Sequence, residues 1–309
     1  MSNKERYRQL CESVGSAIPI FQQHWWMEAV CQGKRWDVLL SHRGGRIAGA
    51  LPFLYGRRFG LRYVLQPQLT QYTGPWLSTA LGEEERLRTI DDLAQQVDDM
   101  HLALFALHFA PTIDNWLPFY WRGYHQTTRY TYRFDPLRPV DELMAAAQPQ
   151  RRKRLGVLAE QCEVDRAVPV DEFAQFHHAY FTQRDGFNLV PQQLVEEVCR
   201  TAIGREQGLI YGLRDRQGRL LVADFVVYDD RQAHSLLSGM SGAAPRNANS
   251  LLFWTILGDL YGRTQAFDFE GSMDKGIGQF FRSFGATATP LMQVYRSRIP
   301  LATKLLHLG

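Results

Sequence analysis

Cysteine is scarce in this chain of 309 residues. Its four cysteines, Cys11, Cys31, Cys162 and Cys199, are scattered, and no two have the spacing of a zinc-binding pair or a redox motif. Scattered cysteines are typical of free thiols in a reducing compartment. We therefore expect a cytoplasmic protein with neither disulfides nor a metal site.

Long apolar runs and an excess of one charge are also missing. No segment approaches the roughly 20 apolar residues that cross a bilayer, and the N-terminal MSNKERYRQLCESVG lacks the apolar core of a signal peptide. The formal net charge is only +3, which argues against a DNA-binding protein and against a disordered acidic chain. The sequence predicts a soluble protein, without a transmembrane segment, whose basic surfaces are local.

What the chain does have is apolar content, 45% of its residues, which suffices for sizeable cores. In its C-terminal half, two strands from Tyr211 are joined by a Gln217-Gly218 turn, and a third strand ends at Ser241. A helix follows, which we expect Asn249 or Ser250 to cap. The segments AFDFEGS, FFRSF and LMQVYRS then predict a short strand, a short helix and a last strand.

The N-terminal half repeats this pattern. RGGRIAGALPFLYG resembles RQGRLLVADFVVYD, TQYTGPW corresponds to SGMSGAAP, LALFALHF to AFDFEGS, and FYWRGYHQTTRYTYRF to FFRSFGATATPLMQVY. Turns are expected at Gly44-Gly45 and Gly56, followed by a helix across GEEERLRTIDDLAQQVDDM. The repeat predicts an α/β protein of two tandem domains, residues 1–137 and 138–309, with the boundary near Asp135 to Pro139.

Three differences between the repeats point to the second one as the site of chemistry. Asp224 lies within an apolar strand where the first repeat has Leu51, and Asp268 and Glu270 share one face of AFDFE because strand side chains alternate. In addition, SGMSGAAPRNANS is rich in small and polar residues where the first repeat has TQYTGPW. We expect the active cleft in the second domain.

The segment FDFEGSMDKGIGQFFRSFGA and the GMSGAAPRNANSLLFW loop and helix resemble the second half of the Fem-like acyltransferases, a group within the GNAT N-acyltransferase superfamily. The resemblance spans most of the chain. It implies two tandem GNAT-like domains, each a mixed, mostly antiparallel sheet flanked by helices. Members include peptidoglycan aminoacyltransferases that use aminoacyl-tRNA, and bacterial proteins expected to use acyl-coenzyme A.

The resemblance implies transfer of an acyl group, from acyl-coenzyme A as co-substrate, to the amine of a small molecule or cell-envelope precursor. One alternative is a Fem-type aminoacyltransferase that uses aminoacyl-tRNA on a peptidoglycan precursor. The other is a binding protein that has this fold without catalysis.

Acyl transfer to an amine requires a base for the amine proton and donors for the developing oxyanion. Glu270 is the leading candidate for the base because it lies at a strand end, where an α/β sheet opens into its crevice. Its alternative role is to order the following glycine loop. Asp268, the second catalytic candidate, lies deeper, so a structural hydrogen bond is its alternative role.

A coenzyme A acetyltransferase normally has a Q/R-x-x-G-x-G/A loop between a strand and a helix, where backbone N–H groups hold the pyrophosphate. This chain has GMSGAAPRNANS at that place, with a different glycine spacing, and a plain turn at Pro245 is the alternative interpretation. The residues we expect to bind the donor are Gly239, Met240, Ser241, Gly242, Arg246 and Asn249.

Acceptor-binding candidates lie in three further places. The basic run from Arg151 to Arg154 resembles a basic helix start of Fem-like proteins and suits the phosphates of a nucleotide-linked precursor or of tRNA, or else is a solvated helix face. Arg184 and Asp185 match a family pattern near the acceptor cleft, or else form a helix-ending turn.

Tyr72 and Tyr211 are aromatic residues at strand ends, where they either line the pocket or belong to the core. The tail RSRIPLATKLLHLG is short, basic and apolar, which predicts either weak contact with a membrane surface or packing onto the body.

Overall fold

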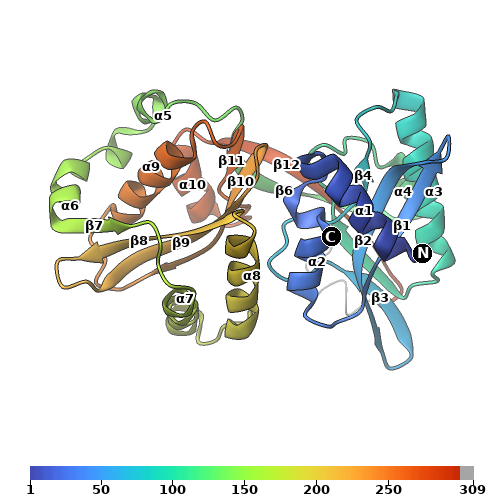
Figure 1. The fold of residues 1–309 in the computed structure, drawn as a ribbon, viewed down its shortest axis with the longest axis horizontal. Coiled ribbons are helices and arrows are strands. Elements are labelled where there is room, and N and C mark those ends of the chain that lie inside the picture. The colour runs from blue at the N-terminus through green and yellow to red at the C-terminus, as the bar shows by residue number, and fades with distance from the viewer. Residues whose placement is uncertain (300–309) are drawn as a thin grey trace. The chain divides into compact units, whose positions relative to one another are not determined.

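The computed structural model describes residues 1–299, which form parts of two compact units. Unit 1 consists of Met1–Arg129 and the C-terminal segment from Pro290, and unit 2 is Tyr130–Thr289 (Figure 1). Within the described residues, none of the helices has the length and apolarity to span a membrane. Most of the tail for which membrane contact was predicted, residues 300–309, lies outside the described part of the chain.

Unit 1 is a sheet with strand order β1-β2-β3-β5-β12, with β4 beside β2. Its helices and strands are α1 (Asn3–Val14), α2 (His24–Cys31), β1 (Trp36–Arg43), β2 (Arg46–Arg58), β3 (Leu61–Leu65), β4 (Trp76–Leu77), α3 (Glu83–Asp99), β5 (Leu104–His108) and α4 (Leu117–Tyr120), with 3-10 turns η1 (Gly15–Ala17) and η2 (Ile20–Gln22). The predicted helix across residues 82–100 is therefore confirmed as α3. Acidic residues in its first turn complement the helix dipole.

Unit 2 is a sheet with strand order β7-β8-β9-β10-β11-β6. Its elements are α5 (Val140–Ala146), η3 (Pro149–Arg151), α6 (Leu155–Gln161), β7 (Cys162–Asp165), α7 (Val170–Asp185), α8 (Gln192–Gly204), β8 (Gly208–Asp215), β9 (Leu220–Tyr228), β10 (Gln232–Met240), α9 (Ala248–Leu260), β11 (Ala266–Asp268) and α10 (Lys275–Ser283). The chain enters this unit within β6 (His125–Phe134) and leaves it within β12 (Thr287–Ser297).

The two sheets have the same pattern of strand directions. In each, an antiparallel meander is followed by one parallel pair, β3 with β5 in unit 1 and β10 with β11 in unit 2. A further antiparallel strand comes next, β12 beside β5 and β6 beside β11. The expected α/β fold of two mixed, mostly antiparallel sheets flanked by helices is thus confirmed.

The last strand of each repeat belongs to the other unit. β6 comes from the first sequence repeat, yet its residues Arg133 and Phe134 pair with β11. β12 comes from the second repeat and pairs with β5 through Gln293–Ser297. The compact units therefore have two boundaries, after Arg129 and before Pro290. The sequence had led us to expect a single boundary between residues 137 and 138. This exchange of strands makes unit 1 discontinuous in sequence.

Helices cover both faces of the unit 2 sheet. α7 and α8 pack on one face, and α9 with its neighbours α5 and α6 packs on the other (Figure 1). β9 is buried along almost its whole length because both of its faces are covered, which explains its nearly continuous apolar sequence. The core of this unit is built around Phe253, Phe267, Phe269 and Phe284.

Three local predictions need correction. Gly56 lies inside β2 rather than in a turn, and the turn is at Phe59-Gly60. Glycine is needed at position 56 because a side chain there would meet the ring of Tyr63 on β3. α9 begins at Ala248 after Asn247, so neither Asn249 nor Ser250 is its cap. β11 ends at Asp268, and Glu270 has a φ of 63°, so it follows the strand rather than continuing it.

Candidate active site

A pocket of about 460 Å³ opens within unit 2 along β9, β10 and the segment after β11. Its walls include six aromatic side chains, and its polar groups include two carboxyl side chains, an arginine and an asparagine. The lining includes Phe181, Arg184, Asp224, Ser235, Gly239, Met240, Asn249, Phe253, Phe269, Glu270, Phe280 and Phe281. A concave, mostly apolar site with a few convergent polar groups is typical of a small-molecule site.

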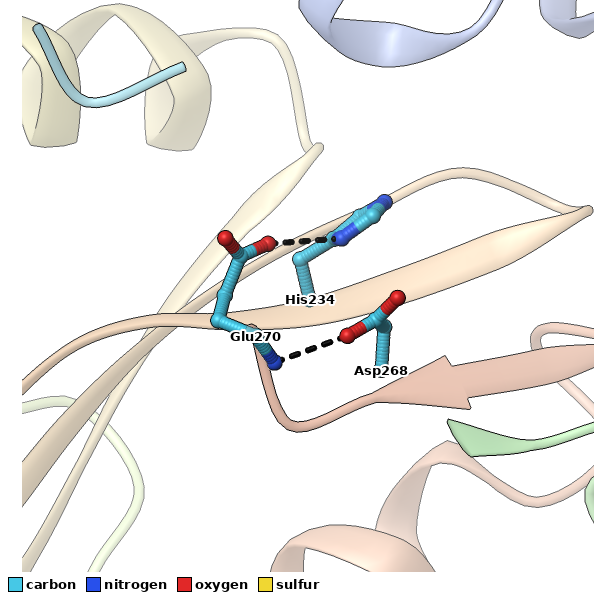
Figure 2. A group of neighbouring side chains, drawn as sticks. All are labelled: His234, Asp268 and Glu270. Atoms are coloured by element: carbon cyan, nitrogen blue, oxygen red, sulfur yellow. Dashed lines mark hydrogen bonds and ion pairs between the residues drawn. The ribbon is translucent and has the colours of Figure 1, made fainter. Parts of the chain in front are cut away.

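Glu270 lies in the pocket wall with a histidine behind it. His234 Nδ1 on β10 lies 2.8 Å from Glu270 Oε1, and a dashed line in Figure 2 marks this contact. Burial, and then the nearby charge of Asp268, hold the pKa of Glu270 well above its ordinary value. Burial, and then the positive charge of Arg133, hold the pKa of His234 well below its ordinary value. The environment therefore disfavours charge on both partners, and the imidazole orients the carboxyl group.

Asp268 fixes the backbone that carries Glu270. The Glu270 N–H donates to Asp268 Oδ1 at 2.8 Å (Figure 2), and Thr131 Oγ1 donates to the same oxygen. Gln232 Nε2 donates to the other oxygen at 3.3 Å, and Arg133 Nε lies 3.8 Å from it. The side chain of Asp268 is fully buried and is not among the residues that line the pocket. Its contacts support the structural alternative considered for this residue.

His234, Asp268 and Glu270 are also side chains of the types that hold metal ions, and their ligand atoms lie within 4.8 Å of one another. In this arrangement the atoms already bind each other and their neighbours: Glu270 Oε1 lies beside His234, and both Asp268 oxygens accept hydrogen bonds. The positive charge of Arg133 beside Asp268 further opposes a cation there. The geometry is that of a hydrogen-bonded cluster.

Asp224 is the second carboxyl group of the pocket. It lies on β9 between Tyr211 of β8 and Ser238 of β10, and it is 2% exposed. Ser235 Oγ donates to Asp224 Oδ2 at 2.8 Å, whereas Oδ1 has no hydrogen-bond partner within residues 1–299. Burial raises the pKa of Asp224 well above its ordinary value. A buried carboxyl oxygen without a partner is costly and requires an explanation.

An irregularity in β10 explains how neighbouring residues of this strand reach both Glu270 and Asp224. The register between β10 and β9 shifts between Ser235 and Leu237, as in a β-bulge. A bulge changes the direction of the side chains beside it, and both Ser235 and Leu236 line the pocket. His234, one residue earlier, pairs with Asp268 in the parallel ladder. β10 thus supplies the imidazole that contacts Glu270 and the hydroxyl group that donates to Asp224.

The donor-binding candidates divide into two groups. Gly239, Met240 and Asn249 line the pocket, whereas Ser241, Gly242 and Arg246 are not among its lining residues. Ser241 Oγ instead accepts a hydrogen bond from the backbone of Ala243 at 3.2 Å. A side chain at Gly239 would contact Phe176 at 2.9 Å, so glycine here allows close packing of β10 against α7.

Arg151 and Arg246 bring positive charge to the N-terminus of α9. Arg151 NH1 donates to Ser250 Oγ at 3.2 Å, and its guanidinium lies 4.6 Å from the ring centre of Phe280. Burial, and then the charge of Arg246, lower the pKa of Arg151. Neither arginine makes an ion pair within the described residues. The side chain of Asn247 donates to the backbone oxygens of Gln150 and Lys153, which ties the basic run to this helix.

The remaining candidates lie in different surroundings. Arg184 lines the pocket, lies 4.5 Å from the ring centre of Phe181, and pairs with Asp185 at 2.6 Å. Tyr211 is a buried core residue of unit 2, and burial raises its pKa to about 12. Arg154 is exposed and precedes α6.

Tyr72 is buried in unit 1, where its ring meets Phe21 edge-on. It belongs to a different compact unit from the pocket residues of unit 2. Its two possible roles, pocket or core, were both left open by the sequence, and its surroundings within unit 1 are those of a core residue.

Known proteins share the fold of this chain. FemX superposes with a TM-score of 0.71 at 12% identity, covering 94% of this chain and 95% of FemX. The C-terminal domain of a protein assigned as a lysylphosphatidylglycerol synthetase of Agrobacterium fabrum gives 0.62 at 13% identity, with 98% and 95% coverage. A tandem GNAT protein from the clavulanic acid biosynthesis pathway gives 0.54 at 12% identity, with 94% and 92% coverage.

No curated protein matches the sequence. The family described as "Acetyltransferase (GNAT) domain" matches residues 141–278, which include every lining residue of the pocket except Phe280 and Phe281. Residues 141–278 are thus similar to a GNAT acetyltransferase domain, and the chain shares the fold of FemX and of a tandem GNAT protein, in agreement with the Fem-like, tandem GNAT fold expected from its sequence.

Proposed function

We propose that this protein transfers an acyl group from an acyl-coenzyme A to the amine of a small molecule or cell-envelope precursor. The observation that carries the proposal is the Glu270 carboxyl group, which lines an aromatic pocket of a GNAT domain and is held by His234. An elevated pKa suits a general base that works near neutral pH, because it gains affinity for the proton it removes.

In this proposal the amine attacks the acyl carbonyl while Glu270 accepts its proton. The new N–C bond forms, the C–S bond of the thioester breaks, and the thiolate leaves with a proton from solvent or from Glu270. His234 is a positioning residue, since it contacts Glu270 without lining the pocket. The aromatic walls around Phe253, Phe269 and Phe281 exclude water from the reacting groups.

Asp224 supports an amine as the acceptor. Its unpartnered Oδ1 needs a hydrogen-bond donor, and an ammonium group supplies both the donor and a compensating charge. The surrounding aromatic side chains add cation–π attraction for the same group. We infer that Asp224 holds an ammonium of the acceptor and that Glu270 deprotonates the amine that reacts.

For the donor, we propose that its phosphates lie near Arg151, Arg246 and the N-terminus of α9. Two arginines without ion pairs in the described residues, beside the positive end of a helix dipole, suit an anion. Gly239 and Asn249 would then border the path from these phosphates into the pocket.

Aminoacyl-tRNA is the second candidate donor. Arg152, Lys153 and Arg154 are exposed, so three cations of the basic run are accessible to a phosphate backbone. If tRNA binds there, Arg152→Glu with Arg154→Glu weakens its binding and flattens the salt dependence. Equal tRNA binding by the variant and the natural chain at every salt concentration would eliminate this candidate.

The experiment that tests the main proposal measures thermal unfolding with acetyl-coenzyme A, longer acyl-coenzyme A esters and aminoacyl-tRNA, each added separately. A ligand at a hundredfold excess over its Kd stabilises the native state by about 2.7 kcal/mol. Stabilisation by an acyl-coenzyme A, followed by thiol release when amines are added, is the expected result. Stabilisation by tRNA alone supports the second candidate, and no stabilisation by any of them favours a binding protein without catalysis.

A further inference from the structure

The hairpin formed by β2 and β3 in unit 1 ends in an exposed, strained aromatic residue. Phe59 is 89% exposed and Leu61 is 47% exposed. The two turn residues Phe59 and Gly60 have φ values of 50° and 79°. Such a turn favours Asn, Asp or Gly, and a bulky aromatic residue at its first position is strained. Phe59 thus costs backbone strain and exposes apolar surface, without contributing to the core.

Positive charge surrounds this tip. Arg57, Arg58 and Arg62 lie on the hairpin beside Phe59 and are exposed, and they form no ion pair within residues 1–299. The Arg58 guanidinium lies 5.2 Å from the ring centre of Phe59. Figure 1 shows the β2–β3 hairpin reaching beyond the other elements of unit 1. The tip can therefore approach a flat surface before the rest of this unit does.

A groove at the base of the hairpin extends the basic surface. It has a volume of about 480 Å³ and is lined by Lys34, Arg35, Arg57, Tyr55, Gln66 and Gln68 among others. Lys34 and Arg35 are exposed and likewise lack ion pairs in the described part of the chain. Three cations with amide and phenol donors around a groove of this size suit a phosphate-bearing headgroup.

We propose that the β2–β3 hairpin docks unit 1 on an anionic phospholipid surface, with Phe59 and Leu61 inserted at the interface and a lipid phosphate in the groove. Apolar residues flanked by arginines suit such a surface, because the apolar side chains enter the acyl-chain region while the arginines contact the anionic headgroups. Each exposed cation near an anionic membrane contributes attraction, so five of them act together. The proposal is independent of the reaction proposed for unit 2.

The test is co-sedimentation of the full chain with vesicles of phosphatidylcholine alone and with about 30% phosphatidylglycerol. We expect binding only to the anionic vesicles, and less of it in about 0.5 M salt because of screening. Arg57→Gln with Arg58→Gln should weaken binding about 10- to 30-fold. The matched control, Arg6→Gln with Arg46→Gln, removes the same charge from exposed positions elsewhere in unit 1 and should bind nearly as well as the natural chain.

A second variant separates docking from folding. Phe59→Asn relieves the strained turn, so its Tm should equal or exceed that of the natural chain while vesicle binding falls about tenfold. Phe187→Ser, at a residue of unit 2 that is 59% exposed, is the apolar control and should not change binding. Equal binding to both kinds of vesicle, or full binding by Phe59→Asn, would overturn the proposal. So would binding to RNA without binding to vesicles.

Discussion

At the scale of single residues, Glu270 combines features that rarely occur together. It is a carboxyl group in a pocket wall, its backbone is in the left-handed region, and a buried histidine contacts its side chain. Left-handed backbone at a non-glycine residue is stable only when neighbours hold it, and Asp268 accepts the Glu270 N–H. This residue is therefore positioned at some energetic cost.

Replacing this carboxyl group tests its role directly. Glu270→Gln should lower turnover about 10²- to 10⁴-fold and leave donor binding intact, because the amide keeps the shape but accepts no proton. The measurement is thiol release together with donor-induced thermal stabilisation. Glu163→Gln, at an exposed position on β7, is the control and should keep full turnover. Unchanged turnover of Glu270→Gln would remove it as the base.

The pH dependence of turnover follows from the raised pKa of Glu270. A base must be ionised to accept a proton, so turnover should increase as pH rises through that raised pKa, well above the ordinary glutamate range. His234→Gln should displace the rising limb, since the imidazole contacts the same carboxyl group. A limb at the ordinary glutamate pKa in the natural chain would contradict this expectation.

Asp224 should show a trade-off between stability and binding. Its pKa is raised in the folded state, so its stability contribution is largest below the ordinary Asp pKa and is lost as pH rises toward the folded value. Asp224→Asn, which cannot ionise, should raise the Tm at neutral pH and flatten its decline with pH. The same change should weaken binding of amine acceptors, measured by titration calorimetry. A lower Tm with unchanged acceptor affinity would show that the carboxyl group serves folding alone.

Asp224 and Glu270 could be selected as candidates from the sequence, whereas the histidine that contacts Glu270 could not. An acid inside an apolar strand and an acid at a strand end are visible without a structure, as Asp224 and Glu270 were. His234 was missed, because it contacts Glu270 only through the parallel pairing of β10 with β11, and a linear sequence does not give the register of a parallel pair.

At the scale of elements, the passage from β11 into the following loop is tightly packed against β6. A side chain on Gly271 would approach the backbone oxygen of Tyr130 to 2.5 Å. Because backbone atoms cannot rotate away, the strand or the loop would have to move. Glu270 precedes this glycine directly, so its position depends on the contact.

Gly271→Ala should therefore destabilise the protein by about 1–3 kcal/mol, as overpacking usually does, and should also lower turnover. The expected result is a lower midpoint of urea unfolding together with a loss of thiol release. Gly204→Ala, at the end of α8, is the matched control, because a side chain there meets nothing within 4 Å. Unchanged stability of Gly271→Ala would contradict the close contact between this position and the Tyr130 backbone oxygen.

Elements joined by glycine turns were the most predictable ones. The turns at Gly44-Gly45 and Gln217-Gly218 join β1 to β2 and β8 to β9 as expected. Gly56 misled the prediction because a glycine also serves close packing, here against the ring of Tyr63. Local sequence does not distinguish these two uses of glycine.

At the scale of the whole molecule, the internal repeat was visible in sequence and the exchange of strands was not. Similarity between halves identifies equivalent strands but does not tell which sheet each strand joins. β12 completes the sheet of unit 1 beside β5, and β6 completes the sheet of unit 2 beside β11. Each unit therefore needs residues from both halves of the chain.

Cutting the chain at the expected domain boundary tests this dependence. Residues 1–137 alone lack β12, and residues 138–309 alone lack β6, so neither fragment should unfold cooperatively by itself. Mixed or produced together, they should form a complex with a cooperative melting transition, detected by circular dichroism and gel filtration. A sharp independent transition of fragment 1–137 would contradict this prediction.

The place of β12 also has a consequence for synthesis on the ribosome. β5 leaves the ribosome long before β12 does, and at about 5–20 residues per second the delay is tens of seconds. During that time β5 presents an unpaired strand edge, which is a site for chaperones and for aggregation. Unit 1 is finished only when β12 has been translated, so a chain that is terminated before β12 carries a permanently open edge by which quality-control proteases can recognise it.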